Sequence, residues 1–536
     1  MAQAIRDKLW KDVYLHRNAL FRLYSELNAL AAISSLPTEI FSLILQYCAN
    51  DRNGRPQKGN IGDLLSIASV CKQWREIALH TPRVWTRIGP GNGTKHLRTA
   101  IRLSKQHLLD VTIDRAYKTD ELKLIFNELE RIQHLDSTLD IGKFFSANTV
   151  LPRLQTLNVE SNRIIDCTRV ISRLSAPILQ SLSLSYFPSC WLELNRFPLL
   201  RHVAVLYKPD AATVGVAALE TMIGFLQDQR SLRTLVLEEF GGYGWESESD
   251  TDSDVSPAPA PRLLPLLEKV QISGAVSLCS ALLRRLSLPS LVHVDFSYIS
   301  HDWQEDAVVD SNIMSAILQV TRCLKELGKP LHLALDGHIS TGATLTIGTQ
   351  AYNEGATSYD DDPIPQLSAH FPSIEFVRDQ LLMHLPLDAV RCAVLSNFRD
   401  ETFLTDLLQK MPHIEELEFE AQSSVYVPLP TLFQKATSPA SPPCPNLRVL
   451  TVVVVEAYKN LDMPDDPTSE VVTDLERHLP RLEHALQLWV HGNPNKKIER
   501  LVIMNYGAGQ LSVEQKARLE VYADQVNVKS DYAEGL

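Results

Sequence analysis

The residues of this chain that could do chemistry lack the spacing that catalytic and metal sites require. A phosphate-binding loop needs the pattern G-x-x-x-x-G-K-[ST], and residues 89–95, which read GPGNGTK, lack the adjacent Gly-Lys pair. Asp250, Asp252 and Asp254 begin like a calcium-binding loop, but Val255 occupies the position that requires glycine. The sequence contains no H-E-x-x-H, no G-x-S-x-G and no Cys/His cluster with metal spacing. We therefore expect no catalytic residue, no metal site and no cofactor.

Cys71 is the cysteine that invites interpretation as a nucleophile, because Lys72 follows it directly. A reactive thiolate needs a base or a positive charge that faces it. Neighbouring helical residues point about 100° apart, and Cys71 falls on the same apolar stripe as Leu64 and Trp74. We therefore interpret Cys71 as a core or interface residue. The eight cysteines form no C-x-x-C pair, which is typical of reduced thiols inside the cell.

The composition of the 536 residues is that of an ordinary folded protein, with 45% hydrophobic and 22% charged residues. No apolar run reaches the roughly 18 residues that a membrane-spanning helix needs, and the N-terminus lacks the apolar core of a secretory signal. Residues 1–110 contain 16 Lys+Arg and 8 Asp+Glu, a net charge of +8, so the remainder carries −20. An acidic remainder repels phosphate backbones. We expect a cytoplasmic or nuclear protein that contacts neither a membrane nor nucleic acid.

An amphipathic helix is predicted over residues 1–33. Its apolar positions recur at alternating spacings of four and three, at Leu9, Val13, His16, Leu20, Leu23, Leu27 and Leu30. Two interpretations are open: a coiled coil that dimerises, or a helix that packs on the next module. We favour packing, because three heptads are marginal and His16 interrupts the seam.

Residues 34–90 are predicted to form a compact helical module. Pro37 lies in the first turn of one helix, a polar insert follows at 50–60, Asp63 opens a second helix, and a third stretch stops before Pro82. The ordered motifs are L-P-x-E-[IL], D-L-L, V-C-K-x-W-R and P-x-x-W, at Leu36, Pro37, Glu39, Ile40, Asp63, Leu64, Leu65, Val70, Cys71, Lys72, Trp74, Arg75, Pro82 and Trp85. These motifs resemble an F-box, and with the charged helix before them they resemble the F-box-like proteins of mushroom-forming fungi.

The resemblance implies docking to a Skp-type adaptor and, through it, to a cullin-RING ubiquitin ligase. A module of about 50 residues cannot bury all its apolar side chains in its own core. The adaptor-binding candidates are Leu36, Pro37, Ile40, Phe41, Ile44, Leu64, Leu65, Val70, Cys71 and Trp74. The alternative is that these side chains close onto the N-terminal helix and the rest of the chain, which would leave no free face.

A short apolar phrase recurs nine times after residue 150. Its last two apolar positions alternate as in a half-buried strand, and the frequent proline before it stops a preceding helix. The copies begin at residues 151, 176, 197, 231, 264, 288, 411, 444 and 496. The unit of a strand and a helix resembles a leucine-rich repeat. The predicted fold class is α/β, a helical F-box module followed by an irregular leucine-rich-repeat solenoid; a generic α/β domain is the alternative.

The positions between the core leucines are expected to face the concave surface where such arrays bind partners. They include five acidic residues and no basic one. The target-binding candidates are therefore Glu160, Glu238, Asp295, Glu418 and Glu420. These residues predict a protein target with a basic surface, although a merely solvated sheet face is an equally good interpretation.

The remaining segments complete the predicted organisation. Residues 91–150 are expected to link the helical module to a repeat array at 151–510, and residues 241–261 to form a disordered acidic loop. Residues 511–536 are expected to hold a capping helix that ends near Gln525. We predict the substrate-recognition subunit of a Skp-cullin-F-box ubiquitin ligase. A scaffold without ubiquitin transfer is the runner-up, and an enzyme with a site in the loops is the third hypothesis.

Overall fold

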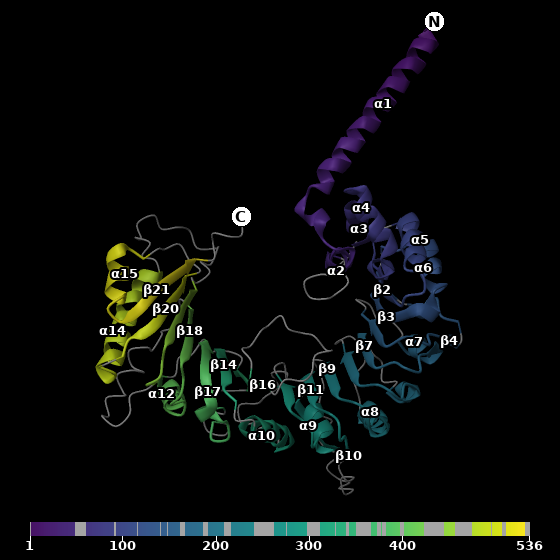
Figure 1. Ribbon diagram of the computed structural model, residues 1–536. Coiled ribbons are helices and arrows are strands. Elements are labelled where there is room, and N and C mark those ends of the chain that lie inside the picture. The colour runs from purple at the N-terminus through teal and green to yellow at the C-terminus, as the bar shows by residue number, and fades with distance from the viewer. Residues whose placement is uncertain are drawn as a thin grey trace, which may run out of the picture. The chain divides into compact units, whose positions relative to one another are not determined.

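The computed structural model shows two compact units, the first made of residues 1–211 with 216–231 and the second of residues 212–215 with 232–536 (Figure 1). The structure describes residues 2–530 except 49–59, 91–92, 115, 140, 147, 161–166, 186–190, 208–215, 241–261, 275, 297–310, 327–328, 339–341, 350–365, 372–376, 378–381, 397–400, 423–443, 456–473, 495 and 506–510. The predicted disordered loop at 241–261 lies outside the described residues, as does nearly all of the polar insert at 50–60.

The first unit begins with helices. They are α1 (Ala2–Ala29), the short 3₁₀ helix η1 (Ala32–Ser35), α2 (Thr38–Cys48), α3 (Asn60–Ser69), α4 (Lys72–His80) and η2 (Pro82–Trp85). Helix α4 packs against α2 and α3, whereas α1 contacts η1. Fully buried apolar residues at helical spacing, among them Leu45, Ala78 and Trp85, hold α2, α4 and η2 together.

A sheet of parallel strands follows in the same unit, with its strands side by side in chain order. Each pair is parallel, from β1 to β8. The strands are β1 (Arg87–Ile88), β2 (Leu109–Ile113), β3 (Ile132–Ser137), β5 (Thr156–Val159), β7 (Ser181–Ser185) and β8 (His202–Leu206). The connections between them hold α5 (Gly93–Leu103), α6 (Thr119–Phe126), η3 (Leu129–Arg131), η4 (Ile141–Lys143), α7 (Cys167–Arg173) and η5 (Trp191–Arg196), and α8 (Val216–Asp228) follows β8. The short strands β4 (Thr149–Val150) and β6 (Leu174–Ser175) pair separately.

The sheet of the second unit is also mostly parallel, but its strands do not follow chain order throughout. They are β9 (Thr234–Phe240), β11 (Lys269–Gly274), β13 (His293–Phe296), β14 (Leu331–His338), β15 (Gly342–Gly348), β16 (Gln366–Phe371), β17 (Val390–Ser396), β18 (Glu416–Gln422), β19 (Val449–Val455), β20 (Ile498–Asn505) and β21 (Ala523–Ser530). The helices are α9 (Val276–Arg284), α10 (Ser311–Glu326), η7 (Leu387–Ala389), α12 (Glu401–Gln409), α14 (Asp474–Gly492) and α15 (Val513–Leu519), and β10 (Arg262–Leu263) pairs with β12 (Leu286–Ser287).

The order of this sheet reverses in its middle. Strand β13 pairs in parallel with β16, which is antiparallel to β15, which is antiparallel to β14, and β14 then pairs in parallel with β17. Helix α10 contacts both β13 and β16. After β13 the chain passes through α10 to β14, the strand of this part farthest from β13, and returns through β15 to β16. Strand β15 is therefore antiparallel to both its neighbours.

The nine sequence phrases all contain strands of these sheets. In β5, Leu157 and Val159 are fully buried while Asn158 between them is partly exposed, which is the predicted period of two. The phrase's first apolar residue, such as Leu154, is also fully buried. Each copy of the phrase therefore consists of a buried apolar residue followed by a half-buried strand.

Two predicted boundaries are wrong. The expected link at 91–150 contains β2 and β3, which belong to the same sheet as β5; neither strand is among the nine copies recognised in the sequence. The last helix starts as predicted, with a capping box in which the Ser512 hydroxyl accepts from the Gln515 amide and the Gln515 side chain accepts from the Ser512 amide. That helix ends at Leu519 rather than Gln525, and the chain then forms the edge strand β21.

Candidate functional site

The helical module of α2, α3, α4 and η2 closes its own core. Trp85 is fully buried and its indole N–H donates to the Ala78 carbonyl at 2.8 Å, so this large side chain leaves no polar group unsatisfied. The rings of Phe41 and Trp74 lie 4.8 Å apart, which joins α2 to α4. The Ser42 and Thr81 hydroxyls lie 3.2 Å apart at the same junction. The module therefore has an internal framework that can position surface side chains.

The predicted adaptor-binding residues divide into surface and core. Phe41 and Leu64 are buried, so interpreting them as contact residues is wrong: they are the inward-facing members of their helices. The others keep accessible surface: Pro37, Ile40 and Val70 are exposed, and Leu36, Ile44, Leu65, Cys71 and Trp74 are half-buried. The structure adds Leu43 and Tyr47, which are exposed and which the motif did not single out.

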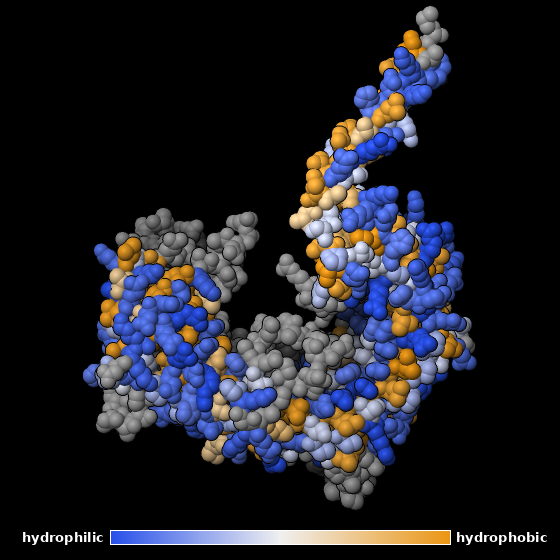
Figure 2. Space-filling view, in the orientation of Figure 1, coloured by the Kyte–Doolittle hydropathy of each residue, from blue (hydrophilic) through white to orange (hydrophobic). Residues whose placement is uncertain are grey.

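Four of these exposed or half-buried apolar residues form one stripe on α2. Ile40, Leu43, Ile44 and Tyr47 are spaced by three and four residues, so they lie along one side of the helix while Phe41 and Leu45 point into the core. Pro37, directly before the first residue of the helix, extends this stripe. Figure 2 shows apolar surface on the module where α2, α3 and α4 lie. We call Pro37, Ile40, Leu43, Ile44 and Tyr47 the α2 stripe.

Cys71 sits between two helices rather than within one. Helix α3 ends at Ser69, and Cys71 is the N-cap of α4, where its Sγ accepts from the Trp74 backbone N–H at 3.5 Å. The prediction that Cys71 lies on one continuous apolar helix stripe is therefore wrong, because the backbone leaves the helical conformation at this residue. The thiol is half-buried and caps a helix end.

Helix α1 does not pack on the module, contrary to the favoured prediction. Leu9, Val13, Leu20, Leu23, Leu27 and Leu30 of its seam are all more than half exposed. Apolar and polar side chains alternate along its whole length in Figure 2. The described part of the chain supplies no apolar surface that covers this seam.

On the first unit's sheet, charged side chains share the face opposite the core leucines. Arg87 of β1, Asp110 of β2 and His134 of β3 are register neighbours. Asp110 lies 3.7 Å from Arg87 and 3.8 Å from His134. Burial raises the pKa of the Asp110 carboxyl, and the neighbouring His134 and Arg87 side chains offset this only in part. This cluster is a partly buried polar contact at the start of the sheet.

On the second unit, a row of alternating charges crosses four neighbouring strands at their amino ends. Glu415 lies 3.6 Å from both Arg391 and Arg448, and Arg448 also binds both carboxylate oxygens of Glu499 at 2.8 and 3.0 Å. The hydrogen bonds between Arg448 and Glu499 raise the pKa of the Arg448 guanidinium and lower the pKa of the Glu499 carboxyl.

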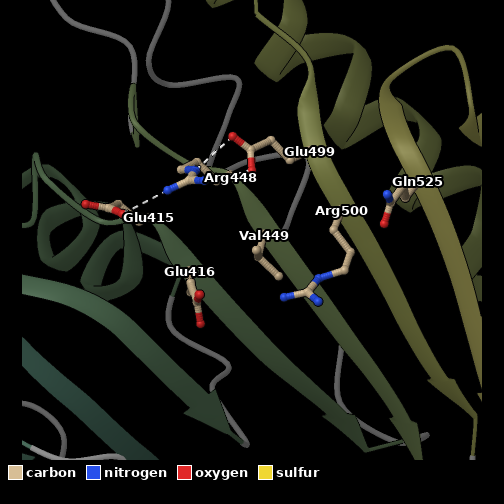
Figure 3. A pocket seen from close by; sticks show the side chains of 7 residues that line it. All are labelled: Glu415, Glu416, Arg448, Val449, Glu499, Arg500 and Gln525. Atoms are coloured by element: carbon tan, nitrogen blue, oxygen red, sulfur yellow. Dashed lines mark hydrogen bonds and ion pairs between the residues drawn. The ribbon is translucent and has the colours of Figure 1, made fainter.

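A hollow of about 320 Å³ adjoins this row. Its lining residues come from β18 to β21 and the turns that precede them: Glu415, Glu416, Arg448, Val449, Glu499, Arg500 and Gln525 (Figure 3). In Figure 3 Arg448 lies between Glu415 and Glu499. The hollow combines carboxylates with guanidinium groups, so it suits neither an anion nor a cation alone.

The five predicted target-binding residues are divided between the two units. Glu160 is exposed on the first unit. On the second unit, Glu238, Asp295 and Glu418 are half-buried and already interact with other groups, and the side chain of Glu420 lies outside the described residues.

Basic residues also lie on this sheet face, outside the positions that were chosen from the sequence. Arg500 lies on the same face of β20, two residues before Val502, which was chosen from the sequence. Arg500 is in register with Val449 of β19, which is in register with Glu416 of β18. Lys269 and His293 occupy the corresponding step on β11 and β13. Part of the face is also covered, since Val236, Thr451, Val453 and Val502 are buried. The positions chosen from the sequence flank only the last core residue of each strand, so they do not include these three basic residues.

Three buried or half-buried cysteines have thiols with raised pKa values. Burial raises the pKa of Cys279 and of Cys444 to about 12, and burial with Glu416 and Glu418 nearby raises that of Cys392 to about 11. Such thiols are protonated and unreactive near neutral pH. Among the described residues, no three His, Cys, Asp or Glu side chains gather as metal ligands, and no helix is long and apolar enough to span a bilayer.

Comparison with known proteins identifies one domain. Residues 33–89 match the family model described as F-box-like. No curated protein matches the chain. Among solved structures, "Crystal structure of TLR13-ssRNA13 complex" is similar over 79% of this chain and 38% of that chain, with 12% sequence identity and a TM-score of 0.24. The chain therefore has an F-box-like domain at residues 33–89, followed by a large sheet-rich part.

Proposed function

We propose that this protein is the substrate-recognition subunit of a Skp-cullin-F-box type ubiquitin ligase. The observation that carries the proposal is the F-box-like match at residues 33–89 together with the α2 stripe on that same domain. F-box domains generally bind Skp-type adaptors. The chain would hold its target close to a conjugating enzyme that the adaptor's complex recruits, so its contribution is raised effective concentration.

The α2 stripe suits an adaptor because folding of the module does not require the stripe to be buried. Phe41, Leu45 and Trp85 already fill the core, so Ile40, Leu43 and Tyr47 remain as accessible apolar surface beside Pro37. Contiguous apolar surface on a folded domain is characteristic of an interaction site. The proposed adaptor-binding set also contains residues that keep accessible surface on the module: Leu36, Ile44, Leu65, Val70, Cys71 and Trp74.

The sheet-rich part is proposed as a leucine-rich-repeat array that binds the target. Parallel strands in chain order, each entered through a buried apolar residue, support this in the first unit and at both ends of the second. Glu160, Glu238, Asp295, Glu418 and Glu420 are the proposed target-binding residues, for a protein with a basic surface.

The adaptor contact is tested by a matched pair of substitutions. Ile40 of the α2 stripe is 45% exposed and Leu199, far along the chain and before β8, is 46% exposed, so both changes add a charge at an equally accessible apolar position. With a Skp-type adaptor, Ile40→Asp should weaken the affinity about a hundredfold. Leu199→Asp should leave it unchanged. Isothermal titration with the full chain measures both.

Two results would overturn the proposal. One is a soluble wild type that binds no Skp-type adaptor at micromolar concentrations. The other is an adaptor complex that Ile40→Asp leaves intact, because the contact would then lie elsewhere on the domain. The adaptor can also bind without any change in the abundance or ubiquitination of the proteins that this chain holds. In that case the scaffold interpretation replaces the ligase one.

A further inference from the structure

The seam of α1 is an apolar surface separate from the α2 stripe. All its apolar members are more than half exposed. All but Leu30, which directly follows the helix, lie on a helix of 28 residues, about 42 Å long. The seam comprises Leu9, Val13, His16, Leu20, Leu23, Leu27 and Leu30. We infer that two copies of this chain associate through α1 as a parallel two-stranded coiled coil. The inference does not depend on the proposed ligase function.

The spacing of the seam selects another helix of the same kind as its occupant. Alternating steps of four and three give a mean of 3.5 residues, which keeps one stripe facing a partner helix that has the same repeat. In heptad terms Val13, Leu20 and Leu27 are a residues, and Leu9, Leu23 and Leu30 are d residues. A second copy of α1 supplies the matching knobs and holes.

The charges beside the seam fix the parallel orientation. Asp12 is a g residue and Arg17 is the e residue five positions later. In a parallel dimer, a g residue faces the e residue of the next heptad in the partner. Asp12 of each copy then faces Arg17 of the other, which gives two attractive pairs. Arg17 is held near this flank by its own Phe21, whose ring centre is 5.2 Å from the guanidinium carbon.

The antiparallel arrangement has the opposite charge balance. In an antiparallel dimer, g residues face g residues and e residues face e residues. The register that pairs Val13 with Leu30 puts Arg17 opposite Tyr24 and forms no ion pair, and the other full register pairs Leu9 with Leu27. Asp12 then faces Glu26 of the other copy twice, and the two Arg17 side chains face each other at the centre. Three like-charge contacts replace two attractive ones, so the parallel dimer is favoured.

His16 sets the register at the expense of affinity. It is the single polar member of the seam, and its Nδ1 lies 2.8 Å from the Asp12 backbone carbonyl. In the parallel dimer the two His16 rings meet in one layer, and a lone polar layer fixes register in coiled coils. His16→Leu should therefore tighten the dimer about tenfold.

A matched pair of leucines tests the seam. Leu23 in the seam is 56% exposed and Leu15 on another side of α1 is 57% exposed. Light scattering after size exclusion should show a dimer for the wild-type full chain at tens of micromolar concentration. Leu23→Asp should give a monomer and Leu15→Asp a dimer. A wild-type monomer, or equal loss with both variants, would overturn the inference.

The orientation is tested by charge exchange. Arg17→Asp and Asp12→Arg should each weaken self-association, because each creates two like-charge pairs in the parallel dimer. Mixed together, the two variants should form a heterodimer in which all these pairs are attractive. In the antiparallel arrangement Arg17→Asp would only exchange one like-charge contact for another. Arg17→Asp that dimerises like the wild type, with no preference for mixed dimers, would contradict the parallel coiled coil.

Discussion

Helix α1 and the module of α2, α3, α4 and η2 are adjacent in sequence and both amphipathic, yet they use apolar residues in opposite ways. In the module, inward residues such as Phe41 and Trp85 form a closed core, and the α2 stripe is what remains outside. In α1 none of the seam is buried. The module can fold first and then bind, whereas α1 gains apolar burial only by association. The two surfaces are therefore expected to have different partners.

The largest expected effect compares two tryptophans. Trp85 is fully buried and Trp10 of α1 is 67% exposed. Trp85→Ala should lower the free energy of unfolding of its unit by about 3 to 5 kcal/mol, because it leaves a cavity and removes the indole hydrogen bond to the Ala78 carbonyl. Trp10→Ala should change it by less than about 0.5 kcal/mol. Urea denaturation followed by circular dichroism measures both, and similar losses would contradict the contrast.

A smaller effect concerns the cap that separates α3 from α4. Serine is a stronger N-cap acceptor than a thiol, so Cys71→Ser should raise the stability of the module by up to about 1 kcal/mol. Thermal unfolding of the full chain measures this change, with Cys48→Ser at an exposed position as the control. A clear loss of stability would mean that Cys71 acts through apolar packing, as the sequence analysis supposed.

The strands were predictable wherever the chain repeats one phrase. The pair Leu157 and Val159 shows why: a period of two with a buried entry residue is a local property of the sequence. The reversed strands β14 to β16 were not predictable, because their order depends on which strand pairs with β13 after α10. Such pairing is a long-range choice that residue patterns do not encode.

The candidate site was predictable in its motif and not in its exposure. Phe41 and Ile40 are neighbouring apolar residues of α2, and only the packing of α4 against one side of the helix makes one core and the other surface. The free state of α1 was not predictable for the same reason: its spacing fits both a partner helix and the adjacent module. Sequence periodicity states that a face is apolar, and tertiary packing decides what covers it.

The most direct test measures the mass of the complex between the full chain and a Skp-type adaptor by light scattering. The wild type should contain two chains and two adaptors. Leu23→Asp should contain one of each, and the double variant Ile40→Asp, Leu43→Asp should remain a dimer of chains without adaptor. Loss of adaptor with Leu23→Asp, or loss of the chain dimer with the double variant, would contradict the account that these two surfaces bind separate partners.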